Sequence, residues 1–235
     1  MSRTAVIAGV GPGLGASIAE RFAEEGCAVG LLARSEPYIE TLAERLREKT
    51  PGEAVAVRTD LGERAAIEAA FDEVRSAFGP VDVLVNHASA ASWDGLLAQT
   101  PADFRRALAV GPEAAFACSQ EAAEDMLAGD GGTVIFTGAT TSVRGRKGAV
   151  GFSAAKFACR GLAESMAREL GSEGIHVAHV VIDGGIRPPD GVPPGREAEE
   201  FLDPDAIADT YWSLVEQDRS AWTLELDVRP HVESF

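Results

Sequence analysis

Short apolar segments alternate with longer amphipathic segments along almost the whole chain. The apolar runs, several of them rich in β-branched residues, are typical of buried parallel strands, and the amphipathic stretches are typical of helices. Strands are predicted at 4–8, 28–33, 54–58, 81–85, 133–137, 175–182 and 224–228, and helices at 16–25, 63–78, 152–170 and 204–217. The alternation predicts one α/β domain over residues 1–235, a doubly wound parallel sheet of about seven strands with helices on both faces.

Two segments add local detail to this pattern. Thr100 is a good N-cap, with Pro101 in the first helical position and Asp103 in the first turn, which predicts a helix from there to about Ala128. The stretch 184–202 is rich in Gly and Pro as far as Glu200. We expect this stretch to be irregular and to form a flap over a ligand site.

The first predicted strand runs directly into a glycine-rich loop, Gly9-Val-Gly-Pro-Gly-Leu-Gly15. Gly9, Gly13 and Gly15 fit a G-x-x-x-G-x-G frame, and a shifted G-x-G-x-x-A frame with Gly11 and Ala16 also fits. Such glycines allow a tight turn and a close approach of the backbone to a pyrophosphate, which then lies at a helix N-terminus. The strand, loop and helix therefore predict a Rossmann-type dinucleotide site, and the alternative is a glycine-rich turn without a ligand.

The end of the second predicted strand bears on which dinucleotide binds. An acid here accepts hydrogen bonds from a ribose 2′-hydroxyl, whereas an arginine accommodates a 2′-phosphate. The chain has Ala33 followed by Arg34, which favours NADP(H) over NAD(H) and argues against a methyltransferase. The alternative is that Arg34 only ends the strand in solvent.

Composition narrows the class of protein. The 235 residues, of which 46% are hydrophobic, suffice for one sizeable core. No apolar stretch has the length of a membrane span or the form of a signal peptide, so we expect a cytoplasmic protein without a membrane partner. Cys27, Cys118 and Cys159 are scattered, so neither a disulfide framework nor a metal site is indicated. The net charge of −16 argues against nucleic-acid binding.

With these features in place, the chain resembles the short-chain dehydrogenase/reductase family along essentially its whole length. Further matches are Asp60-Leu61 after the third strand, Asn86-His-Ala-Ser89 after the fourth, and Lys156 on the helix at 152–170. The resemblance implies that Asp60 bonds the adenine amino group and that Lys156 bonds the nicotinamide ribose. It implies that Asn86 and Ala88 hold the sheet edge beside the adenosine ribose. The implied cofactor-binding residues are Gly9, Gly13, Leu14, Gly15, Arg34, Asp60, Leu61, Asn86, Ala88, Lys156 and Ile186.

The same resemblance implies partners and an assembly. Members of this family act on small-molecule substrates and form homodimers or homotetramers. The helices that pack in such assemblies span about 103–128 and 152–170 in this chain.

The departures from the family pattern concern its catalytic set of Asn, Ser, Tyr and Lys. Phe152 occupies the Tyr position, and counting back by the family spacing puts Ala139 at the Ser position. Gly111 occupies the Asn position, so only Lys156 of the set is present. A Pro-Gly motif after the sixth strand begins with Asp183 here. The chain resembles a divergent subgroup that shares the Phe-for-Tyr change and keeps the nearby Lys.

These departures remove the usual source of a proton. A positioned general acid contributes roughly 10²–10⁴ in rate and an oxyanion donor roughly 10²–10³. Thr140 and Thr141 are candidates for bonding a substrate carbonyl, whereas Ser153 is rotated away from the cofactor side of its helix. His87 titrates in a useful range, although a plain loop histidine is the simpler interpretation. The preferred proton source is a bound water relayed through Lys156.

Two functions remain open. The first is an NADP(H)-dependent oxidoreductase that moves hydride to or from a small carbonyl or alcohol substrate with a non-standard proton donor. The second is a catalytically silent nucleotide-binding sensor or scaffold. An ordinary ketoreductase is disfavoured, because the only tyrosines, Tyr38 and Tyr211, are expected to lie far from Lys156.

One loop raises the question of substrate charge. Ser142-Val-Arg-Gly-Arg-Lys147 contains three basic residues in an acidic chain, and in this fold it borders the mouth of the substrate site. Arg144, Arg146 and Lys147 therefore suggest an anionic substrate, such as a carboxylate or an acyl-CoA phosphate. The alternative is a solvated loop whose charges balance the local field.

Overall fold

The computed structural model describes residues 2–233 and contains a seven-stranded sheet in which every strand is parallel. The strand order is β3-β2-β1-β4-β5-β6-β9. This confirms the predicted fold class, including the number of strands and the doubly wound topology. The strands are β1 (Thr4–Ala8), β2 (Ala28–Ala33), β3 (Glu53–Arg58), β4 (Val83–Asn86), β5 (Gly132–Thr137), β6 (Ile175–Ile182) and β9 (Glu225–Val228).

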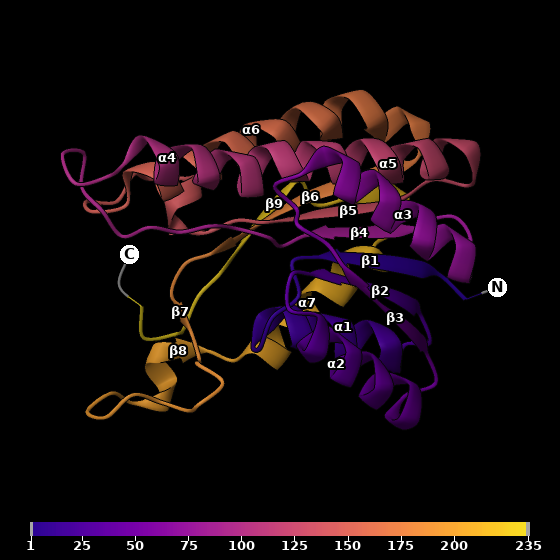
Figure 1. Ribbon diagram of the computed structural model, residues 1–235, viewed down its shortest axis with the longest axis horizontal. Coiled ribbons are helices and arrows are strands. Elements are labelled where there is room, and N and C mark those ends of the chain that lie inside the picture. Colours follow the sequence, from indigo (N-terminus) through magenta and orange to yellow (C-terminus); the bar gives the residue numbers. More distant parts are fainter. Residues whose placement is uncertain (1, 234–235) are drawn as a thin grey trace.

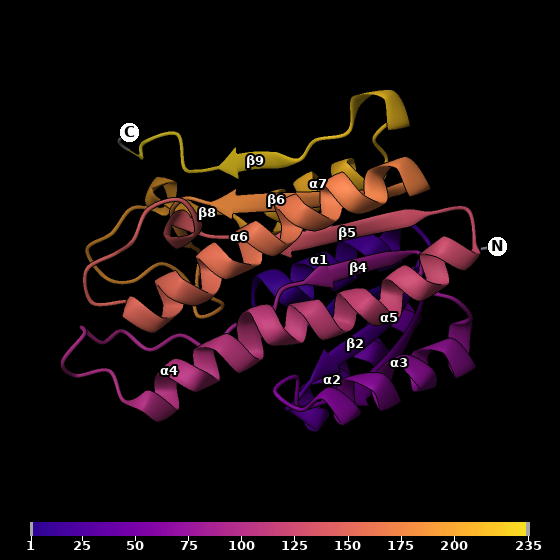
Figure 2. The same ribbon diagram turned by 90° about the horizontal axis from the view of Figure 1, so that it is seen from above.

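Helices cover both faces of this sheet, as Figures 1 and 2 show. Successive side chains of a strand point to opposite faces, so Val6 packs under one helical layer and its neighbour Ile7 under the other. One layer holds α1 (Leu14–Glu24), α2 (Glu36–Lys49) and α7 (Pro204–Val215). The other holds α3 (Arg64–Phe78), α4 (Pro101–Leu108), α5 (Ala114–Ala128) and α6 (Val150–Leu170).

The helix predicted to run from Thr100 to Ala128 is interrupted. Its start is as predicted, because Thr100 Oγ1 accepts a hydrogen bond from the backbone nitrogen of Asp103 at 3.1 Å. Between α4 and α5, however, the chain forms a π-helical turn, η1 (Ala109–Glu113). Pro112 has no amide hydrogen for the α-helical bond to residue 108, so a wider turn replaces that bond. The helical segment still ends at Ala128 as predicted, and the π-helical turn inside it was not predicted.

The segment predicted as an irregular flap contains regular structure. β7 (Gly185–Ile186) pairs in parallel with β8 (Phe201–Leu202), after a 3₁₀ turn, η4 (Ala198–Glu200). Leu202 is buried and packs into the core on the α7 side. The flap is therefore tied to the body at both ends. The remaining 3₁₀ turns are η2 (Thr140–Ser142), η3 (Gly171–Glu173) and η5 (Arg219–Ala221).

The parallel topology gathers the loops after the strands at one edge of the sheet. The residues that follow β1, β2, β4, β5 and β6 meet there, close to the flap. Ligands bind outside the carboxyl ends of the strands in sheets of this kind. Within residues 2–233, no helix combines the length and apolarity that crossing a bilayer requires.

Candidate functional site

A cavity of about 360 Å³ opens at the carboxyl ends of β1, β2 and β4. It lies where the strand order turns back on itself, between β1 and β4. Most of the residues expected to bind the cofactor line it. They are Gly9, Leu14, Gly15, Arg34, Asp60, Leu61 and Ala88. Gly13 shapes the loop, as described below, and Lys156 and Ile186 line a second cavity.

The glycine loop has the shape that a pyrophosphate requires. Gly9 has φ 106°, and a Cβ atom there would lie 2.6 Å from the backbone nitrogen of Ala88. Gly13 has φ 104° and caps α1 without a side-chain hydrogen bond. The helix N-terminus therefore faces the cavity without a side chain to satisfy its amide groups. These residues fit the diphosphate of a dinucleotide.

Arg34 follows the carboxyl end of β2 and lines this cavity. It is exposed and forms no ion pair within the described part of the chain. Across the cavity, Asp60 is also exposed, and its Oδ1 accepts a hydrogen bond from Gly62 N at 3.0 Å. The arginine is thus free to bind an anion there.

Asn86 points away from this cavity. Its Nδ2 donates to Ser119 Oγ of α5 at 3.0 Å, and the side chain is buried. The contact fixes the end of β4 against α5, and the following residues His87, Ala88 and Ser89 reach the cavity wall. Asn86 thus acts on the sheet edge, and its side chain lines neither cavity.

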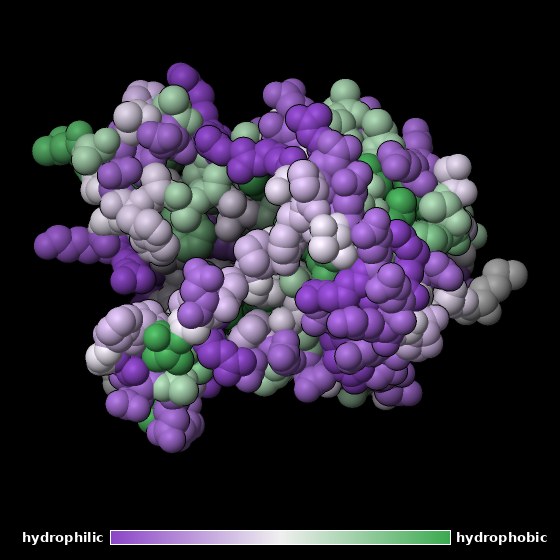
Figure 3. Space-filling model, turned by 60° about the horizontal axis from the view of Figure 1, so that its bottom comes forward, coloured by the Kyte–Doolittle hydropathy of each residue, from purple (hydrophilic) through white to green (hydrophobic). Residues whose placement is uncertain are grey.

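A second cavity, of about 310 Å³, continues from the first and shares His87 and Ser89 with it. Figure 3 shows the surface hollowed on this side of the molecule, beside the lobe that carries β7 and β8. We refer to it as the inner cavity. Its walls come from the loops after β4, β5 and β6, from α6, and from the flap residue Ile186.

Lys156 lies on the wall of the inner cavity. It is 5% exposed, and its Nζ donates to the carbonyl oxygen of Thr137 at 2.6 Å. Burial lowers the pKa of Lys156, because the charged ammonium loses hydration. The ring of Phe152, one turn earlier on α6, is centred 5.6 Å from this nitrogen. A cation and an apolar ring therefore stand side by side.

The hydroxyl groups near Ala139 differ in their availability. Thr140 Oγ1 donates to Asp183 Oδ1 at 2.5 Å, so its hydrogen is already engaged. Thr141 Oγ1 is buried without a hydrogen-bond partner within residues 2–233. Ser153 faces the preceding loop, where its Oγ accepts from Arg146 N at 3.2 Å. Thr140 and Thr141 both line the inner cavity, and of these three hydroxyls only the buried one of Thr141 has no hydrogen-bond partner among the described residues.

A chain of hydrogen bonds connects His87, Thr137 and Tyr211. Tyr211 donates its hydroxyl to Thr137 Oγ1 at 2.8 Å, and His87 Nδ1 lies 3.1 Å from the same oxygen. The side-chain oxygen of Thr137 thus contacts both the phenol of Tyr211 and the imidazole of His87. Burial, and to a lesser extent the charge of Lys156, lowers the pKa of His87 to about 4, so the ring is neutral at pH 7.

Tyr211 therefore lies close to Lys156 in space, and the expectation that it would be far away was wrong. Both residues donate a hydrogen bond to Thr137. The Tyr211 phenol donates to its side-chain oxygen, and the Lys156 ammonium donates to its carbonyl oxygen. The phenol is fully buried and lines neither cavity. Burial also raises the pKa of Tyr211. Its hydroxyl holds α7 to the end of β5.

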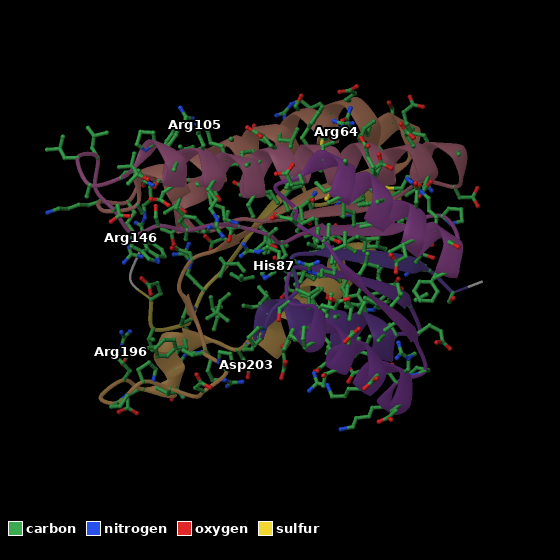
Figure 4. The ribbon with its side chains drawn as sticks, in the orientation of Figure 1. Arg64, His87, Arg105, Arg146, Arg196 and Asp203 are labelled. Carbon is green, nitrogen blue, oxygen red and sulfur yellow. The ribbon has the colours of Figure 1, made fainter. Side chains whose placement is uncertain are left out.

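Two aromatic rings in contact form one wall of the inner cavity. The ring of Trp93 is centred 5.4 Å from that of Phe152, and the guanidinium of Arg146 lies 5.3 Å from the centre of Trp93. Figure 4 places His87 near the ends of the strands and Arg146 farther out, toward the flap. Sequence analysis missed Trp93, because no periodicity assigns the loop between β4 and α4 to this wall.

Comparison with known proteins identifies the family. Residues 3–189 match the family described as short chain dehydrogenase. The chain belongs to the short-chain dehydrogenase family. A 3α-hydroxysteroid dehydrogenase of Mediterraneibacter gnavus is 32% identical over 177 residues, which cover 75% of this chain and 71% of that protein.

Solved structures of short-chain dehydrogenases have the same architecture. The crystal structure of one from Rhodopseudomonas palustris is 33% identical, with a TM-score of 0.86 over 97% of this chain and 99% of that chain. A metagenomic short-chain oxidoreductase in complex with NADP is 27% identical, with a TM-score of 0.83 over 98% of both chains. Structural relatives thus bind NADP.

Proposed function

We propose that this protein is an NADP(H)-dependent oxidoreductase that acts on a small carbonyl or alcohol substrate without a tyrosine as proton donor. The observation that supports this best is the position of Lys156. It lines a cavity that joins the nucleotide cavity at His87 and Ser89. A nicotinamide placed there supplies or accepts the hydride. Lys156 would bond the ribose hydroxyls and orient the ring toward the inner cavity.

The preference for NADP(H) rests on the adenosine end of the cleft. Arg34 is exposed, lacks an acidic partner in the described chain and lines the nucleotide cavity, so it suits a 2′-phosphate. Asp60 would bond the adenine amino group from the opposite wall. The other residues proposed to hold the dinucleotide are Gly9, Gly13, Leu14, Gly15, Leu61, Asn86, Ala88 and Ile186.

The proton source follows from what surrounds Lys156. We assign Phe152, Ala139 and Gly111 to the family's Tyr, Ser and Asn positions, so none of the three donates a proton. The Lys156 ammonium carries three hydrogens, and one is given to Thr137. Since burial lowers its pKa, the ammonium releases a proton more readily than an exposed lysine does. We propose that a bound water carries this proton to the substrate oxygen.

The exposed surface of α5 and α6 supports a homo-oligomer. Phe116 on α5 and Phe157 on α6 are 46% and 43% exposed. Large apolar side chains exposed on adjacent helices favour association of identical copies. We propose a homodimer or homotetramer that packs through these helices, and sedimentation of the purified protein tests this.

A catalytically silent nucleotide-binding protein is the second candidate. Ala139 and Phe152 present no exchangeable proton, and the hydroxyl of Thr140 is engaged with Asp183. A protein whose inner cavity is lined by these three residues can bind a dinucleotide and respond to it without turnover. Such a role suits a sensor or scaffold.

Cofactor binding followed by a substrate screen separates the two functions. The protein is titrated with NADPH and with NADH while tryptophan fluorescence is followed. Carbonyl compounds are then screened for oxidation of the preferred cofactor. We expect NADPH to bind more tightly and at least one carbonyl to be reduced. Lys156→Met should abolish that turnover, whereas Lys49→Met, at the exposed end of α2, should not.

The outcomes are distinct. Absence of NADPH and NADH binding rejects both functions. Tight NADPH binding without turnover over a broad carbonyl and alcohol panel favours the silent protein.

A further inference from the structure

A third cavity, of about 680 Å³, lies outside the inner cavity, and we refer to it as the outer cavity. It opens between the loop after β5 and the first residues of the flap. Trp93, Thr140, Arg146 and Gly184 line both cavities, so the two form one continuous space. A ligand whose reacting carbon lies near Lys156 can therefore extend outward past Trp93.

Trp93 lines both the inner and the outer cavity, and Phe152 lies next to it in the inner cavity. Their ring centres are 5.4 Å apart, the ring planes are tilted by 58°, and each ring has a cation near it. Lys156 Nζ lies 5.6 Å from the Phe152 centre, and the Arg146 guanidinium lies 5.3 Å from the Trp93 centre. The stacked guanidinium is held in place by the indole and keeps its hydrogen-bonding edge for another partner.

The charges of the outer cavity favour an anion. Arg146 and Lys147 line it, and neither lies within 4.0 Å of a carboxylate of residues 2–233. Arg144 is 3.8 Å from Asp183, the acid that already receives the Thr140 hydroxyl and lies 3.3 Å from Arg229. Glu233 is the other acid on this wall.

The overall charge of the chain bears on the role of these two cations. Its net charge is −16, and most arginines on its surface are paired with carboxylates. A negative protein repels anions at long range, so an anionic substrate needs a local positive site at the entrance. Arg146 and Lys147 supply that charge where the substrate enters.

We propose that the outer cavity binds the carboxylate of an oxo acid whose apolar body lies along Trp93 and Phe152. Arg146 bonds the carboxylate and Lys147 adds charge, while the oxo group at the other end of the molecule reaches Lys156. The carboxylate is separated from the reacting carbon by roughly the length of the two neighbouring rings, Trp93 and Phe152. This substrate class rests on the proposed carbonyl reduction, because that function places the reacting carbon in the inner cavity.

Matched ligands test the proposal without turnover. The probes are 4-acetylbenzoate, which has an oxo group and a carboxylate at opposite ends of a ring, and its neutral methyl ester. Their binding is followed by the quenching of tryptophan fluorescence and by calorimetry, with and without NADPH. We expect the acid to bind about tenfold more tightly than the ester, and we expect added salt to reduce this difference.

Variants that each remove one positive charge test whether the preference for the acid over the ester arises in the outer cavity. Arg146→Gln should weaken binding of the acid about tenfold and leave the ester unchanged. Lys147→Gln should have a smaller effect in the same direction. Arg105→Gln removes the same charge from an exposed position on α4 that lines neither the inner nor the outer cavity, and should change neither ligand. Melting temperatures of all variants confirm that they fold.

Three results would overturn the proposal. The first is equal affinity of the unaltered protein for the acid and the ester. The second is equal affinity of the Arg146→Gln and Arg105→Gln variants for the acid. The third is binding of adenosine 3′,5′-bisphosphate that Arg146→Gln weakens, without any binding of 4-acetylbenzoate, which would assign the cations to a phosphate. Failure of NADPH to bind would instead refute the proposed function, so the two failures are distinguishable.

Discussion

The ammonium nitrogen of Lys156 lies 5.6 Å from the centre of the Phe152 ring, one helical turn away on α6. The cation is buried, and its one hydrogen bond in the described chain goes to the carbonyl of Thr137. A cation beside an apolar ring can orient a ribose, but the ring contributes no proton. Whether the protein is an enzyme therefore depends on whether a group other than Phe152 supplies the proton.

Introducing a phenol at this position tests the electrostatic effect of Lys156 directly. In Phe152→Tyr, the nearby ammonium should hold the phenol pKa below its ordinary value of about 10. Ultraviolet difference titration against the unaltered protein isolates the new phenol from Tyr38 and Tyr211. Leu97→Tyr, at a fully exposed position between β4 and α4, is the control and should titrate near the ordinary value. Equal pKa values for the two new phenols would contradict this placement of Lys156.

Adding the serine should extend this result to activity. In the double variant Phe152→Tyr with Ala139→Ser, reduction of carbonyl compounds with NADPH should rise by roughly 10²-fold or more, because a general acid and an oxyanion donor are both added. An inactive but folded double variant would point to Gly111 or to the shape of the pocket.

Cofactor choice should depend on Arg34. Replacing it by Ala removes a charged partner of the 2′-phosphate, so the NADPH dissociation constant should rise about tenfold or more while that for NADH stays unchanged. Fluorescence titration with both cofactors measures this. Arg106→Ala, an exposed change on α4, is the control for charge alone. A parallel loss of NADH affinity would show that Arg34 does not recognise the 2′-phosphate.

The pH dependence of stability should reveal His87. Burial lowers its folded-state pKa from 6.5 to about 4, so between these values the unfolded chain binds a proton that the folded chain does not. Stability contributed by neutral His87 is therefore complete above about pH 6.5 and is lost as the pH falls toward 4. His176 and His179 also have lowered pKa values, so the unaltered protein includes their contributions.

Comparison with His87→Asn separates these contributions. Urea unfolding at several pH values should give a shallower dependence for the variant over this range. Parallel profiles for the two proteins would refute the buried, neutral state of His87.

Two glycines of the nucleotide loop should respond differently to the same change. Gly9→Ala puts a Cβ 2.6 Å from the backbone of Ala88 at φ 106°, and should cost about 2 kcal/mol or more of unfolding free energy. Gly11→Ala has no neighbouring atom within 4 Å and should change stability by at most about 0.5 kcal/mol. Thermal or urea unfolding of both variants checks the difference. Equal stability of the pair would mean that the loop relaxes freely.

The Tyr211 hydroxyl should matter for stability and not for chemistry. Tyr211→Phe removes its hydrogen bond to Thr137 and should cost about 1 kcal/mol, since Thr137 Oγ1 keeps His87 as a partner. Tyr38→Phe, where the hydroxyl makes no hydrogen bond with the described residues, should have little effect. Any turnover found for the protein should survive in Tyr211→Phe. Its loss would mean that the phenol reaches the substrate.

Local sequence signals determined much of this protein. The apolar runs placed all seven strands of the main sheet within a few residues, because a strand buried on both faces needs an unbroken hydrophobic segment. The glycine loop and the position of Arg34 could also be predicted from the sequence, because a tight turn and a strand end depend on adjacent residues. The start of α4 was readable from Thr100 and Asp103, whose contact spans a single helical turn.

The tertiary structure alone decided which side chains meet at the site. Thr137 joins Lys156, His87 and Tyr211, although Tyr211 is 74 positions away in the chain. That meeting requires β5 to lie between β4 and β6 and α7 to cover the opposite face from α6. The contact of Trp93 with Phe152 likewise joins a loop and the start of α6, which no periodicity connects. Periodicity reports which face of an element is buried, whereas the partner on that face is set by the packing of the whole chain.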